Sequence, residues 1–283
     1  MMSAVICFAS VGCNGNDDVA VATTPSPKTD VEVLNDNLRA LNASYEQSST
    51  RMPKWLRKLI IAAADVSGCL LSNVAGGAIL SGLAWKVTGE KVFESSVTVS
   101  TPETINPYLY PGVALKPLKM EKAVFGPVNN VGVQHNDIIN AALASDSLLL
   151  TKSTDEIINT VFEAATARTG VSYSKEDRAQ MTNLVNEMIS CYDPNKSISE
   201  YMGSLKSCTK DQTRREALDA CSIVLEGMQY VDDSDTLYLA KVKHLVNTST
   251  IKPDLKKMIL RGVSVADGSA KLWNTEALNR GGN

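Results

Sequence analysis

The stretch RMPKWLRKLIIAAADVSGCLLSNVAGGAILSGLAWKVTGE, residues 51–90, decides the fold of this chain. Residues 66–85 within it carry no charge and form a run long enough to span a bilayer. The run also contains three serines, an asparagine and four glycines, which argues against a simple span. Small residues recur at every fourth position, a spacing that lets two helices approach closely: Ala64, Gly68, Ser72 and Gly76. We expect a buried helical hairpin broken at Gly76–Gly77, with a membrane-inserting or oligomerising element as the alternative.

The start of the same stretch has a cationic side and an apolar side. Pro53 fits the first turn of a helix. On a helix that begins there, four basic residues share one side and the apolar residues share the other. A basic amphipathic helix of this kind can lie on anionic lipid. The candidate membrane-contact residues are Arg51, Lys54, Trp55, Arg57 and Lys58.

Most of the remaining chain has helical patterns. Aromatic residues make up only 5% of the chain, a composition that favours helices over a sandwich or barrel. Ser174 with Asp177, and Ser197 with Glu200, are capping-box-like helix starts. Apolar stripes follow at helical spacing, such as Met181, Leu184, Val185, Met188 and Ile189. We predict a mainly α fold, an antiparallel helical bundle with a glycine-rich helical hairpin and a short irregular or extended connector.

Changes in composition divide the chain into five segments. Residues 1–13 are a candidate lipoprotein signal, and residues 14–30 are a polar flexible tether. Residues 31–91 hold an N-terminal helix and the cationic glycine-rich segment, and residues 92–128 are a proline-rich extended connector. The helical bundle occupies residues 129–277, with VSVADGSAKLWN (263–274) as a separate last helix.

The N-terminus, MMSAVICFASVGCNGNDD, resembles a bacterial lipoprotein signal in which Cys13 carries the lipid. A short apolar run ends in Gly12–Cys13, and the polar NGNDD that follows is similar to the tether of Bacteroidetes surface lipoproteins. The chain departs from the usual signal because no Lys or Arg precedes the apolar run. Two interpretations follow: a true start upstream of Met1, or a frayed terminus with a chance cysteine. We expect the lipoprotein signal.

One of only two histidines, His135, lies in NNVGVQHNDIINAAL, residues 129–143. The candidate ligand-binding residues are His135, Asn136 and Asp137. Residues two apart on a helix do not face each other, so Asp137 is a poor acid–base partner for His135. Asn136 or Asp137 is expected to cap the helix that begins there. A structural histidine is therefore the preferred interpretation over a catalytic one.

Other motifs with a known chemistry are missing from the sequence. It contains no G-x-S-x-G, H-E-x-x-H, EF-hand loop or G-x-G-x-x-G. Residues 77–82 have the glycine spacing of a phosphate loop, but Leu83–Ala84 follow where Lys-Ser/Thr is required. The acidic run Asp232–Asp235 is expected to cap a helix rather than hold a cation. We expect no metal and no cofactor.

Net charge and cysteine content limit which partners and which cellular compartment are expected for this protein. The net charge of -3, with both signs interspersed, argues against nucleic acid as a partner. The six cysteines form no C-x-x-C pair. If the protein is exported, one pair among Cys191, Cys208 and Cys221 is expected to form a disulfide, and spacing alone does not choose the pair. The alternative is that all are buried free thiols.

Three segments resemble uncharacterised Bacteroidetes cell-envelope lipoproteins: VG-x-x-HN at 131–136, PKWLRKL at 53–59, and SVADGSAKLW at 264–273. Together they extend over most of the chain, from Arg51 to Trp273. The resemblance implies an envelope location, most simply anchored at the outer membrane, and a helical fold. It implies no activity.

Three functional hypotheses remain. The first is a non-enzymatic envelope lipoprotein that acts as a binding or assembly module, with membrane lipid as one partner through its acyl anchor and a protein as another. The second is a membrane-active, oligomerising protein that uses the Arg51–Val87 segment. The third is an enzyme centred on His135. The oligomeric state stays open.

Overall fold

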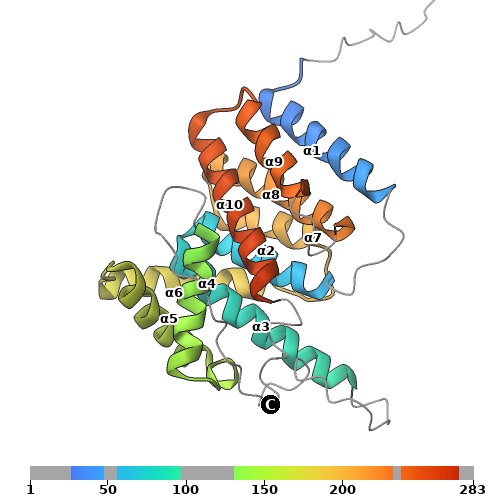
Figure 1. The fold of residues 1–283 in the computed structure, drawn as a ribbon. Coiled ribbons are helices and arrows are strands. Elements are labelled where there is room, and N and C mark those ends of the chain that lie inside the picture. Colours follow the sequence, from blue (N-terminus) through green and yellow to red (C-terminus); the bar gives the residue numbers. More distant parts are fainter. Residues whose placement is uncertain (1–26, 48–55, 97–130, 232–236, 274–283) are drawn as a thin grey trace, which may run out of the picture.

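The computed structural model describes residues 27–47, 56–96, 131–231 and 237–273, and every regular element within these ranges is a helix (Figure 1). The prediction of a mainly α chain is confirmed. The α-helices are α1 (Asp30–Glu46), α2 (Leu56–Leu71), α3 (Val74–Ser96), α4 (Val131–Ser145), α5 (Thr154–Thr169), α6 (Lys175–Ser190), α7 (Ile198–Ser204), α8 (Gln212–Gly227), α9 (Leu237–Thr248) and α10 (Pro253–Leu272). Short 3-10 helices are η3 (Leu149–Thr151), η4 (Leu205–Cys208) and η5 (Met228–Tyr230).

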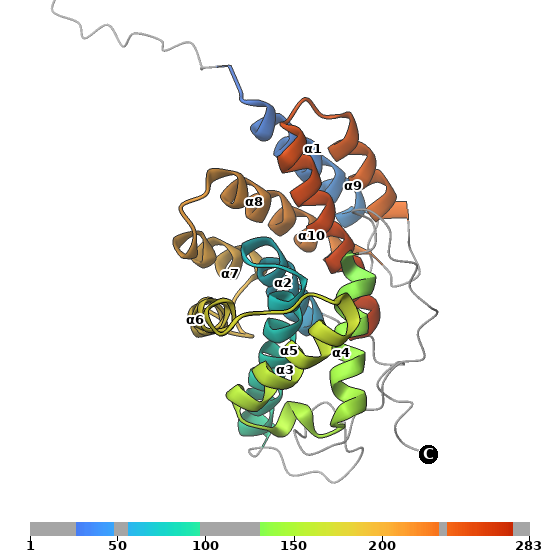
Figure 2. The ribbon, with the colours of Figure 1, turned by 90° about the vertical axis from the view of Figure 1, so that its left-hand side faces the viewer.

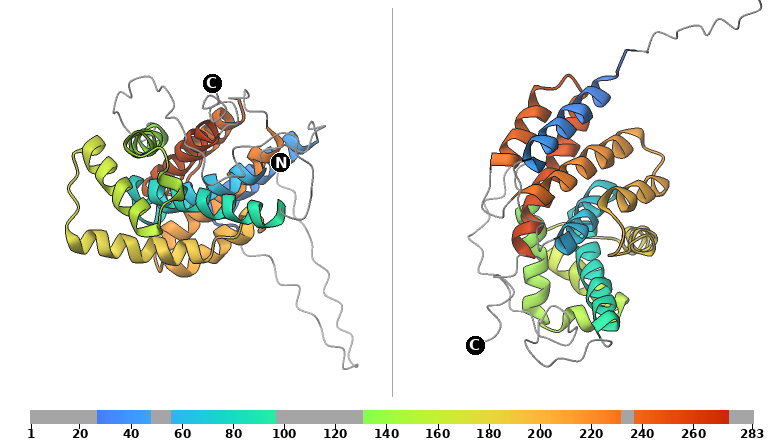
Figure 3. Two further views of the ribbon diagram at one scale, coloured as in Figure 1. Left: turned by 90° about the horizontal axis from the view of Figure 1, so that it is seen from below. Right: turned by 90° about the vertical axis from the view of Figure 1, so that its right-hand side faces the viewer.

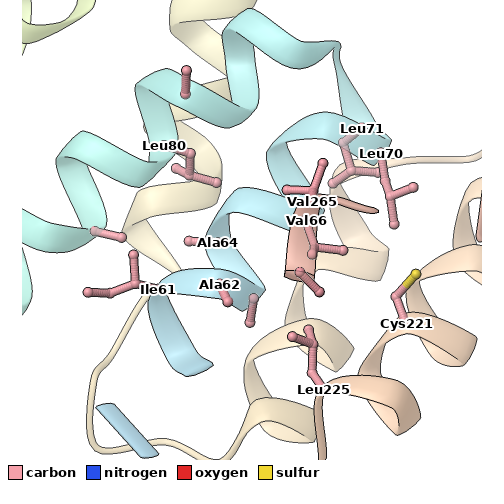
Figure 4. Close-up of a cluster of buried hydrophobic side chains, with 14 of the residues drawn as sticks. Ile61, Ala62, Ala64, Val66, Leu70, Leu71, Leu80, Cys221, Leu225 and Val265 are labelled. Atoms are coloured by element: carbon pink, nitrogen blue, oxygen red, sulfur yellow. The ribbon is translucent and has the colours of Figure 1, made fainter. Parts of the chain in front are cut away.

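Helix α2 is the centre of the fold. All residues from 59 to 68 are buried, so this helix is covered on every side, as expected of a helix that is apolar all round. It contacts α3, α10, α8 and α7. Figure 4 shows its side chains surrounded by Leu80 of α3, Leu225 of α8 and Val265 of α10. Residues 59–68 therefore lie in the middle of the core.

Most of the other helices form two groups. Helices α1, α8, α9 and α10 pack together at one end, and α3, α4 and α5 pack together at the other (Figure 2). Helix α10 belongs to both regions because it also contacts α2 and α4 (Figure 3). Segments far apart in the sequence, such as α2 and α10, are thereby brought into direct contact.

The hairpin between α2 and α3 turns at Ser72–Asn73, so the predicted break at Gly76–Gly77 is wrong. The Asn73 side chain accepts hydrogen bonds from the backbone N–H of Ala75 at 2.9 Å and of Gly76 at 3.2 Å, and so begins α3. The glycines serve close packing instead. A Cβ added at Gly68 would lie 2.7 Å from the Cα of Gly77, so neither helix tolerates a side chain there.

Local capping explains where several helices begin. The predicted capping boxes at Ser174 and Ser197 are confirmed, with both reciprocal hydrogen bonds present in each. Thr29 and Ser153 begin α1 and α5 in the same way. Gly170, with a φ of 70°, ends α5 in the left-handed conformation that glycine adopts at no steric cost.

Two predicted boundaries differ from the structure. Helix α3 continues to Ser96, past the boundary at residue 92 where extended chain was expected. The segment around Ala266 is not a separate last helix, because α10 runs unbroken from Pro253 to Leu272. Among the helices of the described ranges, none is both long enough and apolar enough to cross a membrane.

Candidate functional site

His135 of α4 and Asp65 of α2 form a buried pair in the core. The distance from His135 Nε2 to Asp65 Oδ2 is 3.5 Å, and the exposed fraction of both side chains is 0%. Asp65 is the single charged residue between Lys58 and Lys86. A single carboxylate within a long apolar run is a sequence signal for a buried functional group. This signal was present at Asp65 and was not recognised.

Neighbouring groups determine which nitrogen of His135 faces Asp65. The Asn136 amide donates to the carbonyl of Gly268 at 2.8 Å, so its oxygen is the atom that lies 3.0 Å from His135 Nδ1. Since this oxygen can only accept, Nδ1 carries a proton. The remaining nitrogen, Nε2, is the one that faces Asp65.

Further hydroxyl and indole groups surround the carboxyl group of Asp65. Trp273 Nε1 donates to Ser81 Oγ at 3.1 Å, and Ser81 and Ser269 are both fully buried. Burial raises the pKa of Asp65 because it disfavours the charged form. His135 opposes that rise most strongly, followed by Ser269, Ser81 and Trp273. The pair is therefore held by helices α2, α3, α4 and α10 together.

The motif residues quoted for the resemblance meet at this place. Gly132 donates its backbone N–H to Ser264 Oγ at 3.0 Å, across the contact between α4 and α10. A Cβ added at Gly268 would lie 2.8 Å from the Gly132 carbonyl oxygen. The glycines thus let α4 and α10 approach until Asn136 reaches Gly268 and His135 reaches Asp65. The VG-x-x-HN and SVADGSAKLW segments are two sides of one helix contact.

The chemistry open to this arrangement is restricted by its burial. A general acid or base must lie within hydrogen-bond reach of a substrate proton, and both side chains of the pair are enclosed by the core. The pair joins α2 to α4. At this buried position, a charge without a partner would lower the stability of the fold. This geometry is that of a structural histidine with a titratable partner.

The other candidate site residues lie elsewhere. Asn136 is inside α4, which begins at Val131, so the expectation that Asn136 or Asp137 caps this helix is wrong. Asp137 points away from the pair and lies 3.7 Å from Arg168 of α5. The three candidate ligand-binding residues therefore contact three different neighbours, namely Asp65, Gly268 and Arg168. The second histidine, His244, is exposed on α9.

Several predictions fall on residues outside the described ranges. They include lipidation at Cys13, the membrane-contact residues Arg51, Lys54 and Trp55, and the acidic run at 232–235. Arg57 and Lys58 lie on the first turn of α2, and their side chains are not described.

A surface hollow of about 400 Å³ lies between α2, the chain leading into α7, and η5. Ile60 and Ile198 contribute apolar surface, and Lys196, Glu226 and Tyr230 contribute polar groups. None of the three candidate ligand-binding residues lines this hollow.

The chain was compared with protein-family models, curated proteins and solved structures, and none of them matches it. The interpretation of the site therefore depends on its geometry and on the sequence.

Proposed function

We propose that this protein is a non-enzymatic lipoprotein of the bacterial cell envelope, where it acts as a binding or assembly module. The proposal of a non-enzymatic protein is supported by the complete burial of Asp65 and His135. This pair is the constellation best suited to acid–base chemistry in the described ranges, and its position in the core suits cohesion between helices rather than turnover.

The anchoring part is supported by the sequence around Cys13. The apolar run, the small residues before Cys13 and the polar stretch after it resemble a lipoprotein signal, although no Lys or Arg precedes the run. The first helix of the described ranges, α1, begins at Asp30, so polar sequence lies between Cys13 and that helix. A helical body held at a membrane by an acyl group suits a binding or assembly role.

Metabolic labelling with an alkyne fatty acid tests the anchor. We expect label on the processed chain that begins at Cys13, in the membrane fraction, and loss of both label and membrane association in Cys13→Ser. Cys7→Ser is the matched control, because Cys7 lies in the same apolar segment and should not affect labelling. An unlabelled, uncleaved chain in the cytosolic fraction of the native host would overturn the proposal.

The alternative of a membrane-inserting Arg51–Val87 segment is less well supported. Its described residues supply the centre of the core, including Leu59, Val66 and Ile79, all essentially inaccessible to solvent. Insertion into lipid would have to expose the α8 and α10 surfaces that these residues cover. Purified protein should therefore leave dye-loaded anionic vesicles intact. Leakage that disappears in a Lys54/Arg57/Lys58→Glu variant would favour the alternative.

A further inference from the structure

The hairpin formed by α9 and α10 concentrates positive charge. Between Leu237 and Arg261 the chain has five lysines and one arginine but a single acidic residue, Asp254. The whole chain has a net charge of -3, so this hairpin is opposite in sign to the molecule that carries it. The cationic residues are Lys241, Lys243, Lys252, Lys256, Lys257 and Arg261.

Two of these cations are engaged by the fold. Lys241 Nζ lies over the ring of Tyr45, 5.0 Å from its centroid. Lys256 Nζ donates a hydrogen bond to the carbonyl oxygen of Asn247 at 2.9 Å. The second contact ties the start of α10 to the end of α9, and the two helices pack against each other. The cations of α10 are thereby held beside those of α9.

The other four cations form what we call the basic face: Lys243, Lys252, Lys257 and Arg261. Lys243 is half-buried and the other three are exposed. Within the part of the chain that the structure describes, none of the four has a carboxylate partner. Lys257 and Arg261 are four residues apart on α10, so their like charges are neighbours on the helix surface. This face therefore favours an anionic partner from outside the chain.

The basic face lies toward the end of the molecule where the chain enters α1. Lys241, near the start of α9, contacts Tyr45, near the end of α1, so the two helices run in opposite directions. The start of α1 and the turn between α9 and α10 consequently lie at the same end of the molecule (Figures 1 and 2). The residues that precede α1 lead back to Cys13. A chain tied to a membrane at Cys13 thus enters the fold beside the basic face.

Acidic side chains at the start of α1 do little to offset this charge. Asp36 forms ion pairs with Lys28 and Arg39. Glu32 accepts a hydrogen bond from the backbone N–H of Thr29 as part of the helix cap. Two of the three carboxylates in the first half of α1 are therefore occupied on α1 itself.

We propose that the basic face docks onto the anionic lipid headgroups of the membrane that holds the protein. This inference rests on the proposed function, because the anchor at Cys13 is what brings the helical body to a membrane. Each Lys or Arg near an anionic bilayer surface raises the affinity about fivefold. An acyl group already confines the body to that surface, so a few such contacts are enough to orient it. Docking through charge leaves the apolar core closed, unlike insertion of the Arg51–Val87 segment.

Flotation of the purified full chain with lipid vesicles tests the docking. The protein carries Cys13→Ser, so no acyl group contributes to binding. Vesicles of equal parts phosphatidylglycerol and phosphatidylcholine are compared with vesicles of phosphatidylcholine alone. We expect binding to the anionic vesicles to be stronger by at least about tenfold. The protein should be released at about 1 M salt, where the Debye length is about 3 Å.

Matched variants locate the contact. Lys243/Lys257/Arg261→Gln should weaken binding to the anionic vesicles by on the order of 100-fold, at about fivefold per cation. The control Lys175/Lys196/Lys210→Gln removes three exposed lysines from other helices and loops and should leave binding within about threefold of the parent protein. Circular dichroism checks that both variants fold. Lys257→Gln alone, at an exposed position, should cost about fivefold and replaces the triple variant if that variant does not fold.

Four results would overturn the proposal. They are equal binding to the two kinds of vesicle, equal losses in the two triple variants, loss of binding only in Lys54/Arg57/Lys58→Glu, and tighter binding to a DNA duplex than to the anionic vesicles. The third result would assign the lipid contact to the start of α2, and the fourth would assign the basic face to nucleic acid. Because Cys13 is replaced throughout, these results do not depend on acylation. Failure of the docking is therefore distinguishable from an absence of fatty-acid label on Cys13.

Discussion

Replacing Asp65 by asparagine should change how the stability of this protein depends on pH. In the folded chain the carboxyl group of Asp65 is enclosed by the core and faces His135 at 3.5 Å. Its pKa is raised by burial. Asparagine has nearly the same shape but no titratable group, so the comparison isolates the contribution of the carboxyl group.

The sign of the effect follows from proton linkage. The unfolded chain ionises Asp65 near its ordinary pKa of about 3.9, and the folded chain ionises it at a higher pH. The stabilisation linked to Asp65 is therefore fully present below about pH 3.9 and is lost as the pH rises through the folded pKa. Between these two pKa values, the free energy of unfolding of wild type relative to Asp65→Asn should fall by up to about 1.4 kcal/mol per pH unit.

Urea denaturation followed by circular dichroism measures this difference. Wild type and Asp65→Asn are unfolded at several values between about pH 4.5 and pH 7.5, and their free energies of unfolding are subtracted at each pH. Groups that titrate in both proteins, such as the exposed Glu32 and Glu200, cancel in the subtraction. A difference that stays constant or grows with pH would refute the reasoning.

The partner of Asp65 provides an independent check. His135→Gln removes the ring nitrogen that faces the buried carboxyl group of Asp65 and should cost about 1–3 kcal/mol of stability. In the Asp65→Asn background the same change should cost at least about 0.5 kcal/mol less, because the carboxyl group that faces His135 is gone. Additive costs would show that the two side chains do not interact.

Two further predictions concern packing and hydrogen bonding. Gly68→Ala should lower the free energy of unfolding by about 1–3 kcal/mol in a urea titration, because the new Cβ would lie 2.7 Å from the Cα of Gly77. Gly203→Ala, at an exposed α7 position with nothing within 4 Å, should be neutral or slightly stabilising. Trp273→Phe removes the hydrogen bond to Ser81 and should cost about 1–3 kcal/mol, whereas an unchanged melting temperature would contradict that bond.

Features encoded by near neighbours were predictable. The capping boxes at Ser174 and Ser197 depend on a side chain and a backbone N–H three residues apart. The stripe that includes Met181, Val185 and Met188 depends on the helical period, and all three side chains are buried. These signals placed α6 and α7 and determined the fold class.

Features that depend on two distant segments were not predictable. The asparagine at position 73 begins α3 and so sets the hairpin turn, while the neighbouring glycines, which are expected to break helices, serve the contact between α2 and α3. Glycine has the same local signature in both roles, and only a facing helix distinguishes them. The same holds for the continuous α10, in which Gly262 and Gly268 lie at buried helix contacts.

By itself the amino-acid sequence determined that this chain forms helices, where many of them begin, and which faces turn inward, since short-range hydrogen bonds and apolar periodicity encode those properties. The tertiary structure alone decided that His135 meets Asp65 in the core, and that Gly132 and Gly268 lie at the contact between α4 and α10. Contacts between helices depend on the path of the whole chain, and no local pattern specifies which of two distant side chains will share a buried space.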